Sequence, residues 1–129
     1  MKEDKLLNKK INLKAILLVI LCTVFTSLGQ IFWKVGTQKL ELNVISIITN
    51  VPFILGFVFY GVGLILLVSA LKFGGLSFLY PFIALSFVWV GLLSHFFLGE
   101  KLSLLKIVAI VIIITGVAII GSGGHRHEN

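Results

Sequence analysis

Long apolar runs separated by short polar segments dominate the chain. Each of four runs is long enough to cross the roughly 30 Å hydrocarbon core of a bilayer as a helix of about 20 residues. They cover residues 14–35, 51–71, 77–98 and 103–120. Stretches such as IVAIVIIITGVAII do not alternate between apolar and polar positions, as the strands of a membrane barrel would. The pattern therefore predicts an all-α membrane protein with four transmembrane helices, since backbone facing lipid must satisfy its hydrogen bonds internally.

The polar segments at the two ends divide the chain into three parts. Residues 1–13 form a basic tail, which we expect on the cytoplasmic side, and residues 14–121 form the four-helix transmembrane domain. Residues 122–129 are polar and rich in glycine, so we expect them to form a mobile tail.

Local signals place several helix ends. Gly36 suits the end of the first helix, and Asn50 followed by Pro52 suits the start of the second. Ser103 suits the start of the fourth. The connection 37–50 contains several apolar residues, so it either lies along the membrane surface or extends the second helix.

The charges are few and unevenly placed. Only 12% of the residues are charged, which is too few to cover the surface of a soluble domain that is 58% apolar. The net charge of +6 does not indicate nucleic acid, because much of it precedes the first span, where it meets anionic membrane lipid. Basic residues also set orientation, since cytoplasmic loops carry an excess of them. With four spans, both termini lie on one side of the membrane. The basic residues on that side are Lys2, Lys5, Lys9, Lys10, Lys14, Lys72 and Arg126. The basic residues on the opposite side are Lys34, Lys39, Lys101 and Lys106.

This distribution favours a multi-pass protein of the cell membrane with both termini in the cytoplasm. The excess comes almost wholly from the N-terminal tail, so an opposite or dual orientation stays open.

No constellation of a soluble enzyme is present in the sequence, and we expect no catalytic residue and no cofactor. The single cysteine, Cys22, lies within the first span and has no intrachain disulfide partner. His125 and His127 stand in the polar tail, and two histidines alone make a poor metal site, so we expect no metal.

A stripe of polar side chains runs along the first predicted helix. At about 100° per residue, one face carries Thr23, Thr26, Ser27, Gln30 and Lys34. Polar groups are costly in hydrocarbon unless paired, so such a stripe faces the bundle interior or a wet cavity. The alternatives are local: the hydroxyls bond to their own helix backbone, Gln30 hydrogen-bonds a neighbouring helix, and Lys34 extends to the interface.

Other helices carry further candidates. Gly56, Tyr60 and Gly63 share one face of the second predicted helix, where small residues let a neighbouring backbone approach. Tyr80 lies at the start of the third. We take Thr26, Gln30, Lys34, Tyr60 and Tyr80 as candidate substrate-binding residues. Ala109 and Gly116 share a face of the fourth predicted helix, which serves either ordinary packing or the joining of two copies into a dimer.

The acidic residues all lie outside the predicted hydrophobic cores. They are Glu3, Asp4, Glu41, Glu100 and Glu128. A proton-coupled exporter of organic cations needs a membrane-buried carboxylate to hold proton and cation in turn. The interior offers instead neutral dipoles and one positive charge, so it favours a phosphate group or a neutral sugar over a lipophilic cation.

Residues 79–121 carry a family resemblance. The pattern from Tyr80-Pro81 to the turn LGEKLS resembles the EamA-type repeat of the drug/metabolite transporter superfamily, and the four-span layout resembles the small multidrug resistance fold. Exporters of that fold carry an essential glutamate in helix 1 at the position aligned with Thr26, so this departure argues against proton-coupled drug efflux. Their glycine-rich helix 3 hinge is also missing.

The resemblance is greater to the small subunits of the aminoarabinose-phosphoundecaprenol flippase. Their helix 1 pattern is similar to Thr26 or Ser27 followed by Gly29, Gln30 and Lys34, and their helix 3 pattern to Tyr80, Pro81 and the stretch FVWV. This implies a transporter that flips a polyprenyl-phosphate-linked sugar or similar polar lipid, as a homodimer or as a heterodimer with a paralogue. The alternatives are an EamA-type exporter of a small metabolite, a cation exporter, and a membrane accessory subunit without transport activity.

Overall fold

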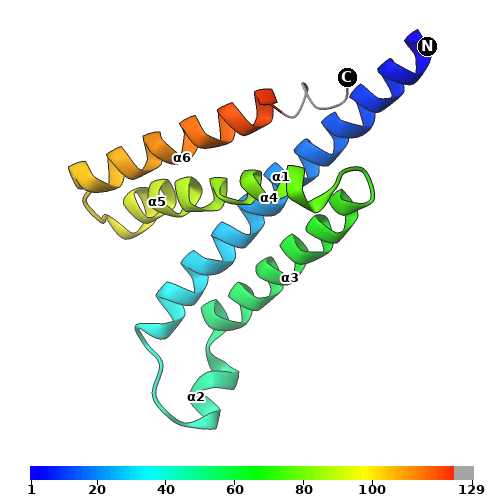
Figure 1. Ribbon diagram of the computed structural model, residues 1–129. Helices are drawn as coiled ribbons and strands as arrows, with labels where there is room; N and C mark the ends of the chain where they lie inside the picture. Colours follow the sequence, from blue (N-terminus) through cyan, green and yellow to red (C-terminus); the bar gives the residue numbers. More distant parts are fainter. Residues whose placement is uncertain (124–129) are drawn as a thin grey trace.

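Figure 1 shows a computed structural model of the chain, which describes residues 1–123. Within these residues all regular structure is helical: α1 (Lys2–Thr37), α2 (Val44–Thr49), α3 (Val51–Leu71), α4 (Leu76–Ile83), α5 (Leu85–Leu98) and α6 (Leu104–Gly123). Four stretches are long and apolar enough to span a membrane: Lys2–Thr37, Val51–Leu71, Phe78–Leu98 and Leu104–Ser122. The all-α architecture with four transmembrane helices is therefore confirmed.

The first helix is longer than the predicted span. The basic residues 1–13 continue the helix of the first span instead of forming a separate tail. Gly36, expected to end the helix, lies inside α1. A methyl group built on it would stand 2.9 Å from the backbone nitrogen of Phe53, so its hydrogen side chain serves close packing against α3.

The connection after α1 contains a separate short helix, α2. Asn43 caps it by accepting from the Ser46 amide at 2.6 Å. Asn50 then interrupts the chain with extended backbone, and its side chain accepts from the Phe53 amide at 3.1 Å, which confirms it as the cap of α3. The backbone at Asn50 breaks the helix. The alternative in which the connection extends the second span is therefore wrong.

The third span consists of two helices instead of one. The break falls at Ala84, between α4 and α5. Pro81 lies inside α4 and supplies no backbone N–H, and its ring also crowds the preceding turn. Beyond Pro81, the amides of Ala84 and Phe87 bond three residues back, to Pro81 and Ala84, at 3.1 Å each. These shorter bonds mark the junction of α4 and α5, which lies in the first half of the span Phe78–Leu98.

The fourth span begins as expected and ends later. The Ser103 hydroxyl accepts from the Lys106 amide at 3.3 Å, which confirms the cap. Helix α6 continues through Ser122 and Gly123, which the sequence assigned to a mobile tail. The remainder of that predicted tail, 124–129, lies outside the described residues.

Helix α1 is the centre of the bundle (Figure 1). It packs against α3 along most of its membrane part and crosses α4 and α5, while α6 packs on α4 and α5. The buried apolar core joins these elements through Ala15, Val19, Ala70, Leu79, Phe82 and Val117. Apart from Val117, most of the α6 span is exposed, so its surface is available to lipid or to another protein chain.

Small residues bring α1 and α3 together. A methyl group on Gly29 would stand 2.8 Å from the Gly56 carbonyl oxygen, and one on Gly63 would stand 3.2 Å from the Cys22 carbonyl oxygen. The notch at Gly56 receives the indole ring of Trp33. The predicted role of Gly56 and Gly63 in close helix packing is therefore confirmed.

Side-chain hydrogen bonds join α1 to α5. The Thr23 hydroxyl oxygen accepts from Trp89 Nε1 at 3.1 Å and donates to the Ile20 carbonyl at 2.6 Å. Ser27 Oγ lies 3.1 Å from the Ser86 carbonyl oxygen and 2.5 Å from that of Thr23. These two members of the polar stripe are fully buried and hold the helices together.

Replacement of Thr23 by valine should destabilise the fold by about 1 kcal/mol, because it leaves the Trp89 N–H without its acceptor in an apolar setting. Valine keeps the shape of threonine, so packing changes little. The free energy of unfolding in detergent measures the effect. Thr115→Val is the matched control, because the Thr115 hydroxyl bonds only the Val111 carbonyl of its own exposed helix. Equal losses in both variants would contradict the assignment.

Candidate functional site

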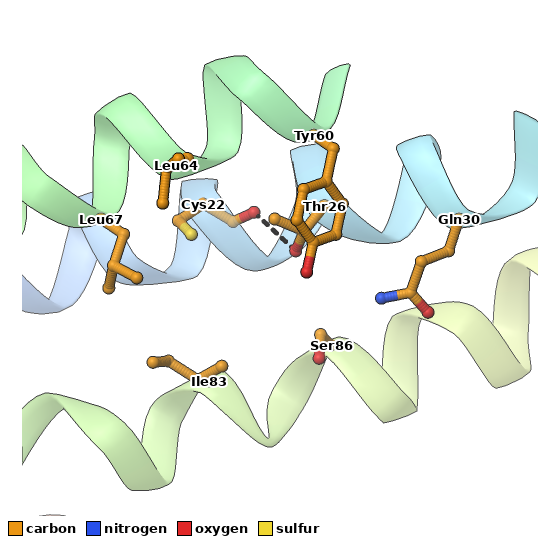
Figure 2. Close-up of a pocket in the computed structure, with 8 residues that line it drawn as sticks. All are labelled: Cys22, Thr26, Gln30, Tyr60, Leu64, Leu67, Ile83 and Ser86. Atoms are coloured by element: carbon orange, nitrogen blue, oxygen red, sulfur yellow. Dashed lines mark hydrogen bonds between the residues drawn. The ribbon is translucent and has the colours of Figure 1, made fainter. Parts of the chain in front are cut away.

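A small cavity with both polar and apolar lining lies between α1, α3 and the α4–α5 span (Figure 2). Its volume is about 110 Å³, and its lining comprises Cys22, Thr26 and Gln30 from α1, Tyr60, Leu64 and Leu67 from α3, and Ile83 and Ser86 from the α4–α5 span. None of these lining residues is acidic or basic. The volume is below the roughly 300–1,000 Å³ of sites for drug-sized ligands, so the cavity as it stands accommodates only part of a polar head group.

Helix α1 places three residues in the cavity at a spacing of four. Cys22, Thr26 and Gln30 therefore lie on one face of the helix, one turn apart. The Thr26 hydroxyl donates to the Cys22 carbonyl at 3.0 Å, which leaves its oxygen able to accept from a ligand. The Gln30 amide has no hydrogen-bond partner within residues 1–123. The alternative in which Gln30 hydrogen-bonds a neighbouring helix is therefore not supported among these residues.

Helix α3 supplies Tyr60, held by aromatic packing. Its ring stacks on Trp33 with 5.0 Å between ring centroids. In Figure 2 the Tyr60 hydroxyl and the Gln30 amide both extend toward the ribbon that carries Ser86. The cavity thus contains the hydroxyls of Thr26, Tyr60 and Ser86 and the amide of Gln30, groups that donate or accept hydrogen bonds without a formal charge.

Lys34 lies outside the cavity, one turn beyond Gln30. Its ammonium forms an ion pair with the Glu100 carboxylate, and Lys106 Nζ approaches the other carboxylate oxygen at 3.5 Å. The hydrogen bond from Lys34 holds the pKa of the Glu100 carboxyl below its usual range, and the nearby Lys106 charge acts in the same direction. Lys34 therefore joins the end of α1 to the loop between α5 and α6, and its role as a substrate-binding residue stays a prediction.

Acidification should weaken this junction. A carboxyl whose folded-state pKa is lowered contributes stability above its unfolded-state pKa and loses it as the pH falls through the folded-state pKa. For Glu100 that loss begins near the ordinary value of 4.5 and continues below it. Thermal unfolding in detergent from pH 7 to pH 3 should show a larger loss for the unmodified chain than for Glu100→Gln. Parallel curves would contradict the pairing.

The remaining candidates lie elsewhere on the structure. Tyr80 is 67% exposed on α4 and does not line the cavity. On α6, Ala109 is exposed, and no atom of a neighbouring helix lies within 4 Å of a methyl group built on Gly116. This face is open to a second copy, and the dimer role of these residues stays a prediction.

Sequence reasoning missed Ser86 and the partners of Lys34. Ser86 lies two residues after the break at Ala84, and Pro81, three residues before that break, was a signal for an irregular segment beside the site. Glu100 is the sole acidic residue between the third and fourth spans. Its pairing with Lys34, 66 positions away, depends on how the helices cross. Within residues 1–123 no group of three or more histidine, cysteine or acidic side chains lies together to hold a metal ion.

Four apolar spans, three of which line a small cavity without acidic or basic side chains, define a multi-pass membrane protein. The model of the EamA-like transporter family matches residues 50–122. The chain belongs to this family, which places it in the drug/metabolite transporter superfamily, as a transporter and not an enzyme.

Three curated proteins are similar to the chain. A "Probable 4-amino-4-deoxy-L-arabinose-phosphoundecaprenol flippase subunit ArnE" of Hamiltonella defensa is 30% identical over 107 residues, which cover 83% of this chain and 96% of that protein. An uncharacterised protein of Sinorhizobium fredii is 29% identical over 116 residues, covering 88% and 99%. A "Probable magnesium transporter" of Arabidopsis thaliana is 27% identical over 121 residues, covering 89% of this chain but 35% of that protein. No solved structure gives a significant match.

Proposed function

We propose that this transporter moves a polyprenyl-phosphate-linked sugar, or a similar polar lipid, across the cell membrane. The observation that carries the proposal is the cavity where the polar side chains of Thr26, Gln30 and Tyr60 meet, which has no carboxylate in its lining and a lysine one turn away. The similarity to a protein described as a flippase subunit for a sugar-phosphate lipid supports it.

The chemistry of the site suits such a head group. Sugar hydroxyls donate and accept, as do the Gln30 amide and the Tyr60 hydroxyl, so each can pair in the cavity. Lys34 lies four residues beyond Gln30, about 6 Å along α1 at 1.5 Å per residue. This distance suits a sugar in the cavity whose phosphate reaches the lysine ammonium.

A dimer is part of the proposal. One chain encloses only about 110 Å³ at the polar site, and α6 leaves a face with Ala109 and Gly116 uncovered. A second copy or a paralogue packed on this face would complete a pathway, with both termini in the cytoplasm. Small residues at the contact allow close helix approach.

The small volume also favours a second candidate, export of a small polar metabolite as in other EamA-type transporters. Magnesium fits this cavity poorly, because Mg²⁺ is usually bound through carboxylates and none lines it. The accessory-subunit alternative predicts that the purified chain has no ligand of its own.

Reconstituted vesicles test transport. A fluorescent polyprenyl-phosphate sugar in the inner leaflet should become accessible to an impermeant quencher when the chain is present, and more slowly with Gln30→Leu. A fluorescent lipid with a choline head group is the control for general leakage. Equal rates for both lipids, or a rate unchanged in Gln30→Leu, would count against the proposal.

A further inference from the structure

An apolar groove lies at the end of the bundle that carries Lys34. Its volume is about 250 Å³, and it runs between α1, the start of α3 and the end of α5. The walls are formed by Leu28, Ile31, Phe32 and Val35 of α1, with Pro52 of α3 and Phe97 of α5. The lining is almost wholly hydrocarbon, whereas the cavity at Gln30 also contains polar side chains.

The groove ends at the ion-pair cluster. Val35 lines the groove and directly follows Lys34, and Leu98, also in the wall, stands two residues before Glu100. At about 100° per residue, Lys34 lies between Gln30 and Ile31 around the circumference of α1. One of these neighbours faces the polar cavity and the other faces the groove. A group bound at Lys34 can therefore contact both.

The cluster itself has an excess positive charge. The ammonium groups of Lys34 and Lys106 approach the two oxygens of one Glu100 carboxylate, so two cations share one anion. Their side chains are 43% and 49% exposed, and that of Glu100 is 33% exposed. The carboxylate is therefore accessible to replacement. Phosphate oxygens accept the same charge-assisted hydrogen bonds as a carboxylate and carry more charge.

We propose that Lys34 and Lys106 bind the phosphate of an anionic lipid, that the groove binds the adjoining part of its hydrocarbon chain, and that Glu100 holds the two lysines until this phosphate displaces it. The inference rests on the proposed function and deepens it, because it assigns the phosphate and the chain of the substrate to named residues. The sugar would then occupy the cavity at Gln30. A free sugar phosphate would leave the groove empty, so the geometry favours a lipid.

Two variants separate the parts of this site. Glu100→Gln removes the competing anion and keeps the shape of the side chain, so the affinity for polyprenyl phosphate should rise about two- to fivefold, the range of an exposed ion pair. Val35→Trp fills the groove and should weaken affinity at least about tenfold through lost apolar contact. Val111→Trp places the same bulk on the exposed surface of α6 and should leave affinity unchanged.

The measurement is the affinity of the purified chain in detergent for polyprenyl phosphate, with inorganic phosphate as the second probe. The lipid should bind more tightly than inorganic phosphate, and the effect of Val35→Trp should be confined to the lipid. Thermal unfolding checks that each variant folds. If Val35→Trp does not fold, Glu100→Gln alone tests the displacement step. If polyprenyl phosphate binds but Glu100→Gln weakens its affinity or leaves it unchanged, the inference is overturned while the proposed function stands. If the unmodified chain binds no polyprenyl phosphate, both fail.

Discussion

Gly29→Ala is expected to destabilise the bundle by about 1–3 kcal/mol, the usual cost of overpacking a close contact. The added methyl group would stand 2.8 Å from the Gly56 carbonyl oxygen and 3.1 Å from the Tyr60 amide nitrogen. Both are backbone atoms, so neither can move aside by a change of rotamer. Relief requires that α1 and α3 separate, which also disturbs Tyr60 at the cavity.

Gly61→Ala provides the control. It introduces the same methyl group into the same helix as Gly56, but nothing lies within 4 Å of that methyl. Its stability should be unchanged or raised by up to about 1 kcal/mol through better helix propensity. The free energy of unfolding in detergent compares the two. Similar values for Gly29→Ala and Gly61→Ala would show that α1 and α3 do not pack through Gly29.

Lys34→Met should lower the affinity for polyprenyl phosphate by about 10- to 150-fold. The expected loss corresponds to about 1.5–3 kcal/mol, the range for a hydrogen bond with a charged partner. Methionine keeps the length and the apolar stem of lysine but removes the ammonium, and Glu100 retains Lys106 as a partner. Unfolding should therefore change much less than binding.

The control for Lys34→Met is Lys101→Met. Lys101 is exposed in the turn next to Glu100, so its replacement removes one positive charge from the same end of the bundle. Titration with polyprenyl phosphate should show a small loss at low salt that fades as salt screens the charge. If both variants lose affinity equally, Lys34 contributes general attraction and not a specific contact.

Much of the fold was predictable because its determinants are local. Span length and hydropathy act within each helix, and Asn50 and Ser103 cap their helices through bonds three residues on. Gly36 shows the limit of such signals. A glycine near a helix end suits either a stop or a close contact, and only the position of Phe53 decides between them. The consequence of Pro81 was likewise open, because a proline either kinks a helix or ends it.

The site was predictable to a smaller extent. Helical spacing placed Thr26 and Gln30 on one face of α1, and the structure brings Tyr60 of α3 to the same cavity. The pairing of Lys34 with Glu100 was not predictable, because it depends on the crossing of α1 with the α4–α5 span. The crossing angle is set by packing at buried contacts such as Ser27 with Ser86, which no short stretch of sequence reveals.

The measurement that most directly tests the account is the thermal stability of the purified chain in detergent with three added ligands: polyprenyl phosphate, a polyprenyl-phosphate sugar and a lipophilic cation. A ligand of the folded state at a hundred times its dissociation constant adds about 2.7 kcal/mol. Both phosphate lipids should stabilise the chain, the one that carries the sugar should do so more strongly, and the cation should not stabilise it. Stabilisation by the cation alone would contradict it, because the cavity described at Gln30 offers no anion to hold one.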